Sequence, residues 1–172
     1  MRRRHPRHRS KRLPKLWLMT DERQGEALWE ALAALPRGSG VVFRHYSLAS
    51  GARQALLARV RRVAARRSLL LVADGEGPVT TASAHNAAEL VAAARRGADL
   101  VFLSPVHPTR THPGAPALGR VRFGLLARRS RVPVIALGGM TARRAEALKK
   151  LGAYGWAAID GLTPQTAVHR TG

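Results

Sequence analysis

Six short stretches of the chain are nearly all apolar and predict buried strands, and a seventh, weaker candidate joins them. Their hydrophobic residues follow one another instead of alternating with polar ones, which is typical of strands covered on both faces of a sheet. The stretch at 78–83 is the weakest, because threonine and serine interrupt it. The predicted strands are 16–20, 41–44, 69–73, 78–83, 99–103, 133–137 and 155–159.

Between most of these strands, apolar residues recur at the spacing of an amphipathic helix. In the segment 26–35, for example, Leu28, Leu32 and Leu35 fall on one stripe. The predicted helices are 26–35, 53–66, 86–96 and 141–150. An alternation of strands and helices predicts βα units and a parallel sheet.

Two parts of the chain share one plan: an Ala/Leu-rich helix, two basic residues, Gly-Ala and a buried strand. They are LVAAARRGADLVFL at 90–103 and AEALKKLGAYGWAAI at 145–159. Gly97 and Gly152 suit the left-handed position just after a helix. A repeated βα unit favours a (β/α) barrel, with a doubly wound open sheet as the alternative.

Polar residues gather where the predicted strands end. In a barrel these ends form one face, and that face carries the chemistry, so we expect a site there. Two of the ends, ALGGMT at 136–141 and AIDGLT at 158–163, are glycine turns that suit a phosphate group. The predicted phosphate-binding residues are Gly138, Gly139, Asp160 and Gly161.

A stiff, polar loop, FLSPVHPTRTHPGAPALGR, occupies residues 102–120. Each proline fixes its own φ and restricts the preceding residue, so such a loop resists disorder. The loop carries histidines, hydroxyls and arginines beside the prolines. We expect it to cover a ligand at the strand ends.

The formal net charge is +20, and residues 1–12 hold six arginines, one lysine and no acid. We interpret 1–12 as a basic, disordered arm. The chain has no cysteine and no apolar run long enough to span a bilayer, which predicts a cytoplasmic protein without a membrane partner. Nucleic-acid binding is disfavoured, because aromatic residues for base stacking make up only 5% of the chain.

The motifs LWLMTD, VVFRHYS, SPVHPTRTHPGAPALG and VIALGGMT resemble the thiamine phosphate synthase family and its TenI-like relatives. The resemblance covers about residues 13–163 and leaves a tail at 164–172. It implies a TIM-type barrel. It also implies a Mg²⁺-dependent transferase of thiamine biosynthesis, joining hydroxymethylpyrimidine diphosphate to thiazole phosphate. The products would be thiamine phosphate and diphosphate.

The resemblance also implies roles for individual residues. The implied catalytic set is Arg44, Ser83, Thr109, Thr111 and His112. Thr109 and Thr111 match hydroxyl donors of the family's lid loop, and Arg44 matches its diphosphate-binding arginine. His112 and Tyr46 stand where the family has lysines, so two fixed cations are absent.

The largest departure from the family is a gap after LLLVADGEG, where a helix, a fourth strand and another helix are missing. We therefore predict an incomplete barrel of about seven strands. Asp74 is the one matching Mg²⁺ ligand. The second metal-ligating aspartate of the family falls in the missing segment. Two interpretations are open: Glu76 replaces it, or the chain is a degenerate relative with weak or absent activity.

Two alternatives to a transferase remain open. One is a TenI-like regulatory protein that binds thiazole phosphate without catalysis. The other is the family's tautomerase branch, whose catalytic histidine falls at Pro105 here, with His107 as a substitute. The sequence makes no prediction of the oligomeric state.

Overall fold

A computed structural model describes residues 12–109, 114 and 116–162. All seven predicted strands are present and form one parallel sheet in the order β3-β2-β1-β7-β6-β5-β4. The strands are β1 (Leu16–Met19), β2 (Gly40–Phe43), β3 (Leu70–Ala73), β4 (Thr81–Ala84), β5 (Leu100–Leu103), β6 (Val134–Ala136) and β7 (Gly155–Ala158). The sheet closes on one side by the pairing of β1 with β7 and stays open between β3 and β4. The prediction of an incomplete seven-stranded barrel is confirmed.

The sheet curls around an apolar interior. Trp17 of β1 meets Phe102 of β5 edge to face, with ring centroids 5.4 Å apart, although two strands separate β1 from β5. Val72 near the open edge belongs to the same buried cluster. Gly40 is needed beside Trp17, because a Cβ there would lie 2.2 Å from the indole ring. The curvature excludes the flat, doubly wound sheet.

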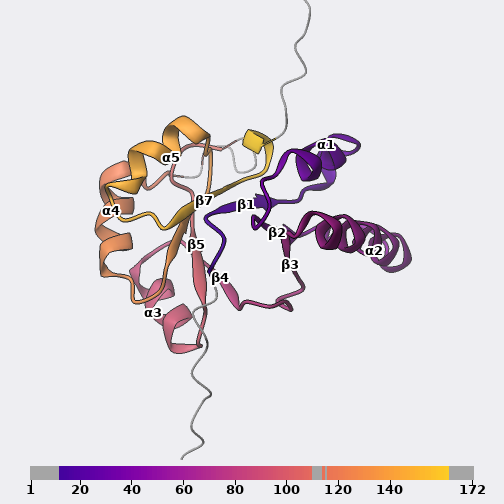
Figure 1. The fold of residues 1–172 in the computed structure, drawn as a ribbon. Coiled ribbons are helices and arrows are strands. Elements are labelled where there is room, and N and C mark those ends of the chain that lie inside the picture. Colours follow the sequence, from indigo (N-terminus) through magenta and orange to yellow (C-terminus); the bar gives the residue numbers. More distant parts are fainter. Residues whose placement is uncertain (1–11, 110–113, 115, 163–172) are drawn as a thin grey trace, which may run out of the picture.

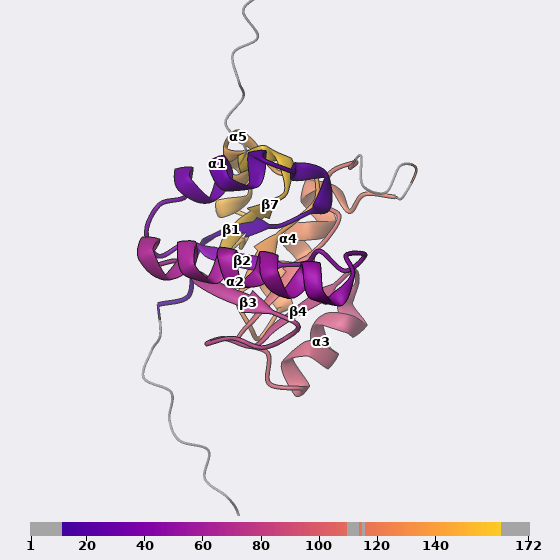
Figure 2. The ribbon, with the colours of Figure 1, turned by 90° about the vertical axis from the view of Figure 1, so that its right-hand side faces the viewer.

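Helices cover the outer face of the sheet in two groups, as Figures 1 and 2 show. α1 (Ala27–Ala34) and α2 (Ser50–Arg67) pack on β1–β3, where Leu28, Leu32 and Val60 are fully or almost fully buried. α3 (Ala87–Arg95), α4 (Gly119–Arg129) and α5 (Ala142–Lys149) pack on β4–β7. Short 3₁₀ helices, η1 (Glu22–Gln24) and η2 (Asp160–Leu162), follow β1 and β7.

A tight hairpin replaces the segment that is missing between β3 and β4. Ala73 and Glu76 exchange two backbone hydrogen bonds of 2.9 and 2.8 Å. The two residues between them, Asp74 and Gly75, have φ of 54° and 76°, as a type I′ turn requires. Gly77 then lies against the edge of β3, since a Cβ there would be 2.9 Å from the Leu71 carbonyl oxygen. The chain therefore turns back along β3 before it enters β4.

The sequence analysis missed α4. This helix carries four arginines and two glycines, with Gly119 at its start and Gly124 within it. These residues obscure the apolar periodicity of the narrow buried stripe that Phe123 and Ala127 form. The predicted arm and tail fall mainly outside the described residues. Within the described part of the chain, no helix is long and apolar enough to span a membrane.

Candidate functional site

A cavity of about 650 Å³ opens at the carboxyl ends of the strands. Its polar lining includes five residues that the sequence predicted for the site: Arg44, Asp74, Ser83, Thr109 and Gly138. Met19, Phe102 and Leu137 are among its apolar lining residues. The lining also reaches Val72 of β3 and Thr81 of β4, so the cavity extends into the open seam of the barrel.

Other predicted site residues lie elsewhere. Gly139 and Asp160 are not among the described lining residues of the cavity, and Gly161 belongs to η2 with Asp160. Asp160 opens η2, and its charge raises the pKa of Arg23 in a minor way beside the larger effect of Asp21, so it lies towards the β1 loop. Thr111 and His112 fall outside the described residues.

The ends of β1 and β2 are joined by a buried threonine. The Thr20 hydroxyl accepts a hydrogen bond from the Arg44 backbone N–H at 2.9 Å and lies 3.0 Å from Nδ1 of His45. The His45 ring is buried and stacks on Phe43 with centroids 4.9 Å apart. Burial lowers the pKa of His45, so the imidazole is neutral at pH 7. The hydrogen bond from the Arg44 backbone N–H to Thr20 fixes the backbone from which the Arg44 side chain projects.

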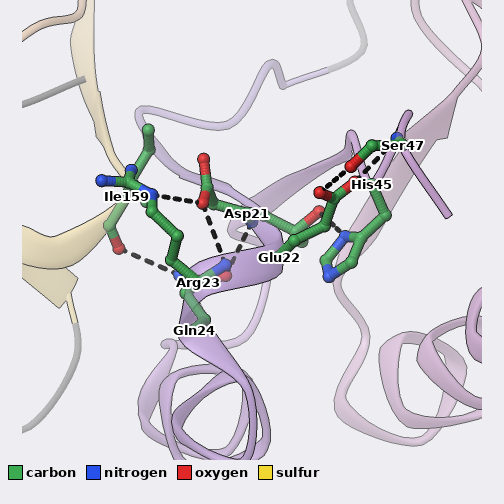
Figure 3. Close-up of polar contacts among 8 residues, drawn as sticks. Asp21, Glu22, Arg23, Gln24, His45, Ser47 and Ile159 are labelled. Carbon is green, nitrogen blue, oxygen red and sulfur yellow. Dashed lines mark hydrogen bonds and ion pairs between the residues drawn. The ribbon is translucent and has the colours of Figure 1, made fainter.

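The loop after β1 makes two further ties, shown in Figure 3. Asp21 caps η1 together with Gln24, whose side-chain amide donates to the Ile159 carbonyl at the end of β7. On the other side, the Glu22 carboxylate accepts from the hydroxyl and the backbone N–H of Ser47. These hydrogen bonds lower the pKa of Glu22. Both acids of this loop are therefore engaged within the protein.

Asp74 is held by an arginine that the sequence analysis did not single out. Arg53 of α2 donates to both carboxylate oxygens, at 2.8 and 2.7 Å, and its Nε donates to the His45 carbonyl at 3.1 Å. The pairing lowers the pKa of Asp74. In the sequence, Asp74 stands out only as part of a DG turn, and Arg53 only as one of several cations in a helical segment. Neither signal identifies the other residue as its partner.

The described residues do not fit the Mg²⁺ site that the resemblance implies. Magnesium takes oxygen ligands in a near-ideal octahedron, mostly from carboxylates, phosphates and water. All ten acidic residues lie in the described part of the chain, and no group of three His, Asp or Glu there could hold a metal ion. Asp74 uses both of its oxygens for Arg53.

On the other side of the seam, His85 joins the ends of β4 and β5. Its Nδ1 lies 2.8 Å from the carbonyl oxygen of Ser104, which can only accept, so Nδ1 carries the proton of this hydrogen bond. His85, Ser83 and Ser104 all line the cavity. The sequence analysis predicted Ser83 for the site and did not single out His85, two residues further on.

The glycine turn after β6 packs tightly against the base of the polar loop. Gly138 and Gly139 have φ of 97° and 59°, and added Cβ atoms would lie 2.7 Å from Pro105 Cα and 2.8 Å from the Pro108 carbonyl oxygen. The backbone N–H of His107 donates to the Gly138 carbonyl at 3.1 Å. Glycine is required here by the loop itself, whether or not a ligand also approaches.

His107 lies under this loop and does not line the cavity. Burial, with Arg144 and Arg120 nearby, lowers the pKa of its imidazole. This position weighs against His107 as the catalytic histidine of a tautomerase.

A family model described as thiamine monophosphate synthase matches residues 75–162, slightly more than half of the chain. The chain belongs to the thiamine monophosphate synthase family. The match begins one residue after Asp74 and contains the cavity residues of β4–β7. The family assignment from the sequence is confirmed, whereas the roles of the individual site residues stay predictions.

Named relatives agree with the family. The chain is 43% identical over 86 residues to a thiamine-phosphate synthase of Salinispora tropica, covering 49% of this chain and 40% of that protein. It is 38% identical over 78 residues to a putative thiamine-phosphate synthase 2 of Aquifex aeolicus, covering 45% of this chain and 42% of that one. The matches thus span less than half the length of these curated relatives.

A solved structure shares the fold across more of the chain. The thiamine phosphate pyrophosphorylase of Pyrococcus furiosus superposes with a TM-score of 0.68 at 20% identity, covering 85% of both chains. The fold likeness therefore includes the β1–β3 region, which the family model does not match.

Proposed function

We propose that this chain acts in thiamine biosynthesis as a weakened thiamine phosphate synthase, coupling hydroxymethylpyrimidine diphosphate to thiazole phosphate. The observation that carries the proposal is the cavity, which gathers Arg44, Ser83, Thr109 and Gly138 at the strand ends of a family barrel. Its mixed lining suits two small ring compounds with anionic groups. The names of the relatives support the same reaction class.

In the proposed reaction, the bond between the pyrimidine methylene carbon and the diphosphate oxygen breaks, and its electron pair leaves with the diphosphate. The lone pair of the thiazole nitrogen then forms the new carbon–nitrogen bond. Arg44 is positioned to stabilise the charge that develops on the diphosphate, because its backbone is fixed by Thr20 and its side chain lines the cavity. The apolar lining, including Phe102, limits access of water to the carbocation.

Weak turnover is part of the proposal. Loss of one preorganised electrostatic contact commonly costs about 10²–10³ in rate. Tyr46 lines the cavity where the family has a lysine, and no step is assigned to a metal ion because the donor set does not fit one.

The alternative is a non-catalytic, TenI-like protein that binds thiazole phosphate. It is supported by the Arg53–Asp74 pair, which engages the acid otherwise expected at the metal. In that case, the glycine turn and the polar loop on the β4–β7 side would bind the thiazole phosphate.

The discriminating experiment measures thiamine phosphate formation by the purified chain with both substrates, followed by chromatography, and binding of thiazole phosphate by calorimetry. Slow product formation that Arg44→Gln abolishes supports the transferase. Binding without product supports the non-catalytic protein. Absence of both contradicts both proposals.

We also propose the domain bounds, the partners and the compartment. The barrel domain is 13–163, with the basic arm 1–12 before it and the tail 164–172 after it. The partners are small phosphorylated molecules, and the compartment is the cytoplasm.

A further inference from the structure

Asp74 occupies the first central position of the type I′ turn that follows β3 at the open edge of the sheet. Its φ of 54° is left-handed, a conformation that aspartate adopts more readily than most residues. The side chain is about half exposed, yet its carboxylate has a fixed partner in Arg53.

Arg53 is more constrained than an ordinary surface arginine. Its side chain is only 17% exposed. The guanidinium carbon lies 5.1 Å from the ring centroid of Phe43 and 5.6 Å from that of Tyr46, within cation–π range of both. With the hydrogen bond from Nε to the His45 carbonyl, the guanidinium is oriented from several sides before it meets Asp74.

A divalent cation at Asp74 would have to displace this arginine. Two parallel, charge-assisted hydrogen bonds would break, and the guanidinium would remain beside a dication of the same sign. In return the metal would gain the Asp74 carboxylate, and no group of three or more His, Asp or Glu among the described residues is placed to hold it. The loss of the two hydrogen bonds and the repulsion between the guanidinium and the metal ion both oppose metal binding.

We infer that the Arg53–Asp74 ion pair takes the place of a metal ion in this chain, so that phosphorylated ligands bind the cavity without a divalent cation. The inference rests on the proposed function for the identity of those ligands only. The pair itself is electrically neutral, so among the described lining residues the positive charge that meets a ligand anion comes from Arg44.

The test uses Mn²⁺ as a paramagnetic probe of the magnesium position, titrated into the full chain without diphosphate, because diphosphate itself chelates Mn²⁺. We expect no saturable Mn²⁺ site below about 1 mM on the protein, the weak limit of protein sites for divalent cations, and diphosphate binding that calorimetry detects in EDTA. Asp74→Asn should, like the wild type, show no such Mn²⁺ site. Product formation, where measurable, should be equal in Mg²⁺ and in EDTA.

A stability cycle tests the pair independently of any ligand. Arg53→Gln and Asp74→Asn should each lower the unfolding midpoint, and the double variant should lower it by less than the sum. Arg61→Gln, on the exposed side of the same helix, is the matched control and should change little.

The outcomes separate the inference from the proposed function. One bound Mn²⁺ that Asp74→Asn removes would overturn the inference, and so would a metal site that Asp74→Asn leaves intact. Additive effects in the stability cycle would overturn the pairing. Failure to form thiamine phosphate, with no metal site and a coupled cycle, would contradict the transferase while leaving the inference standing.

Discussion

The strand ends of β1–β3 and those of β4–β7 carry comparable sets of polar residues but use them differently. On the β1–β3 side, charged groups contact one another or the backbone: Arg53 holds Asp74, and Glu22 holds Ser47. On the β4–β7 side, glycine turns and a proline-rich loop make contacts mainly through the backbone. Asp74 and Glu22 at these strand ends are therefore already engaged by protein groups, an arginine in one case and a serine in the other.

The boundary between the two sides coincides with the hairpin. The family match starts at residue 75, and the chain before it follows the family fold without matching the family model. The β1–β3 side thus retains the architecture, and the β4–β7 side retains more of the family pattern.

The largest expected effect is on the β4–β7 side, from Gly139→Val. A Cβ at this position would lie 2.8 Å from the Pro108 carbonyl oxygen in a left-handed backbone conformation. We expect a loss of about 2–5 kcal/mol in the free energy of unfolding. Thiazole-phosphate binding, measured by calorimetry, should be abolished. Gly51→Ala, where the added Cβ meets nothing within 4 Å, is the control, and equal behaviour of the two variants would contradict this view of the turn.

The next effect concerns the cation of the β1–β3 side that lines the cavity. Arg44→Gln should weaken diphosphate binding by roughly 10- to 150-fold, because a hydrogen bond to a charged group is worth about 1.5–3 kcal/mol. Calorimetry measures this loss of diphosphate affinity, with Arg61→Gln as the matched control. Unchanged affinity in Arg44→Gln would show that the β4–β7 side binds the anion alone.

A pH effect on stability should come from His45. The folded chain disfavours protonated His45, whereas the unfolded chain takes up that proton below about pH 6.5. Stability should therefore fall as the pH drops through this value, with a further contribution in the same direction from His107. Thermal unfolding between pH 5 and 8 should show a smaller fall in His45→Gln than in the wild type. An identical fall would assign the effect to other groups.

The smallest effect should come from His85, which ties β4 to β5. Asparagine can place a donor near the position of Nδ1, so His85→Asn should retain the hydrogen bond to Ser104 and much of the stability. His85→Ala should lose about 0.5–1.5 kcal/mol. Chemical denaturation of both variants measures the difference. Equal stability of Asn and Ala at this position would mean that the tie contributes nothing.

Local pattern was sufficient for the strands and for most helices, because buried parallel strands and capped amphipathic helices leave signals within a few residues. It failed for α4, where arginines and glycines mask a narrow buried stripe. The face that carries the cavity was also predictable, since it follows from the parallel order of the strands.

The partners within that face were not predictable. Arg53 and Asp74 lie on separate elements, and only the hairpin and α2 together bring them into contact. Likewise, Gly138 and Gly139 have a local signature of ligand approach, yet their closest neighbours are residues of the polar loop. Such pairings depend on tertiary packing, which no short stretch of sequence encodes.

The Asp74–Gly75 turn has a consequence for how the chain could be divided. All strand pairings before the turn are among β1–β3, all those after it are among β4–β7, and only the β1–β7 ladder joins the two sets. Cleavage of the backbone at Gly75 would remove the two hydrogen bonds of the turn and no pairing between parallel strands. Two separately produced fragments should therefore reassemble through β1, β7 and the Trp17–Phe102 contact, which makes this barrel suited to fragment complementation.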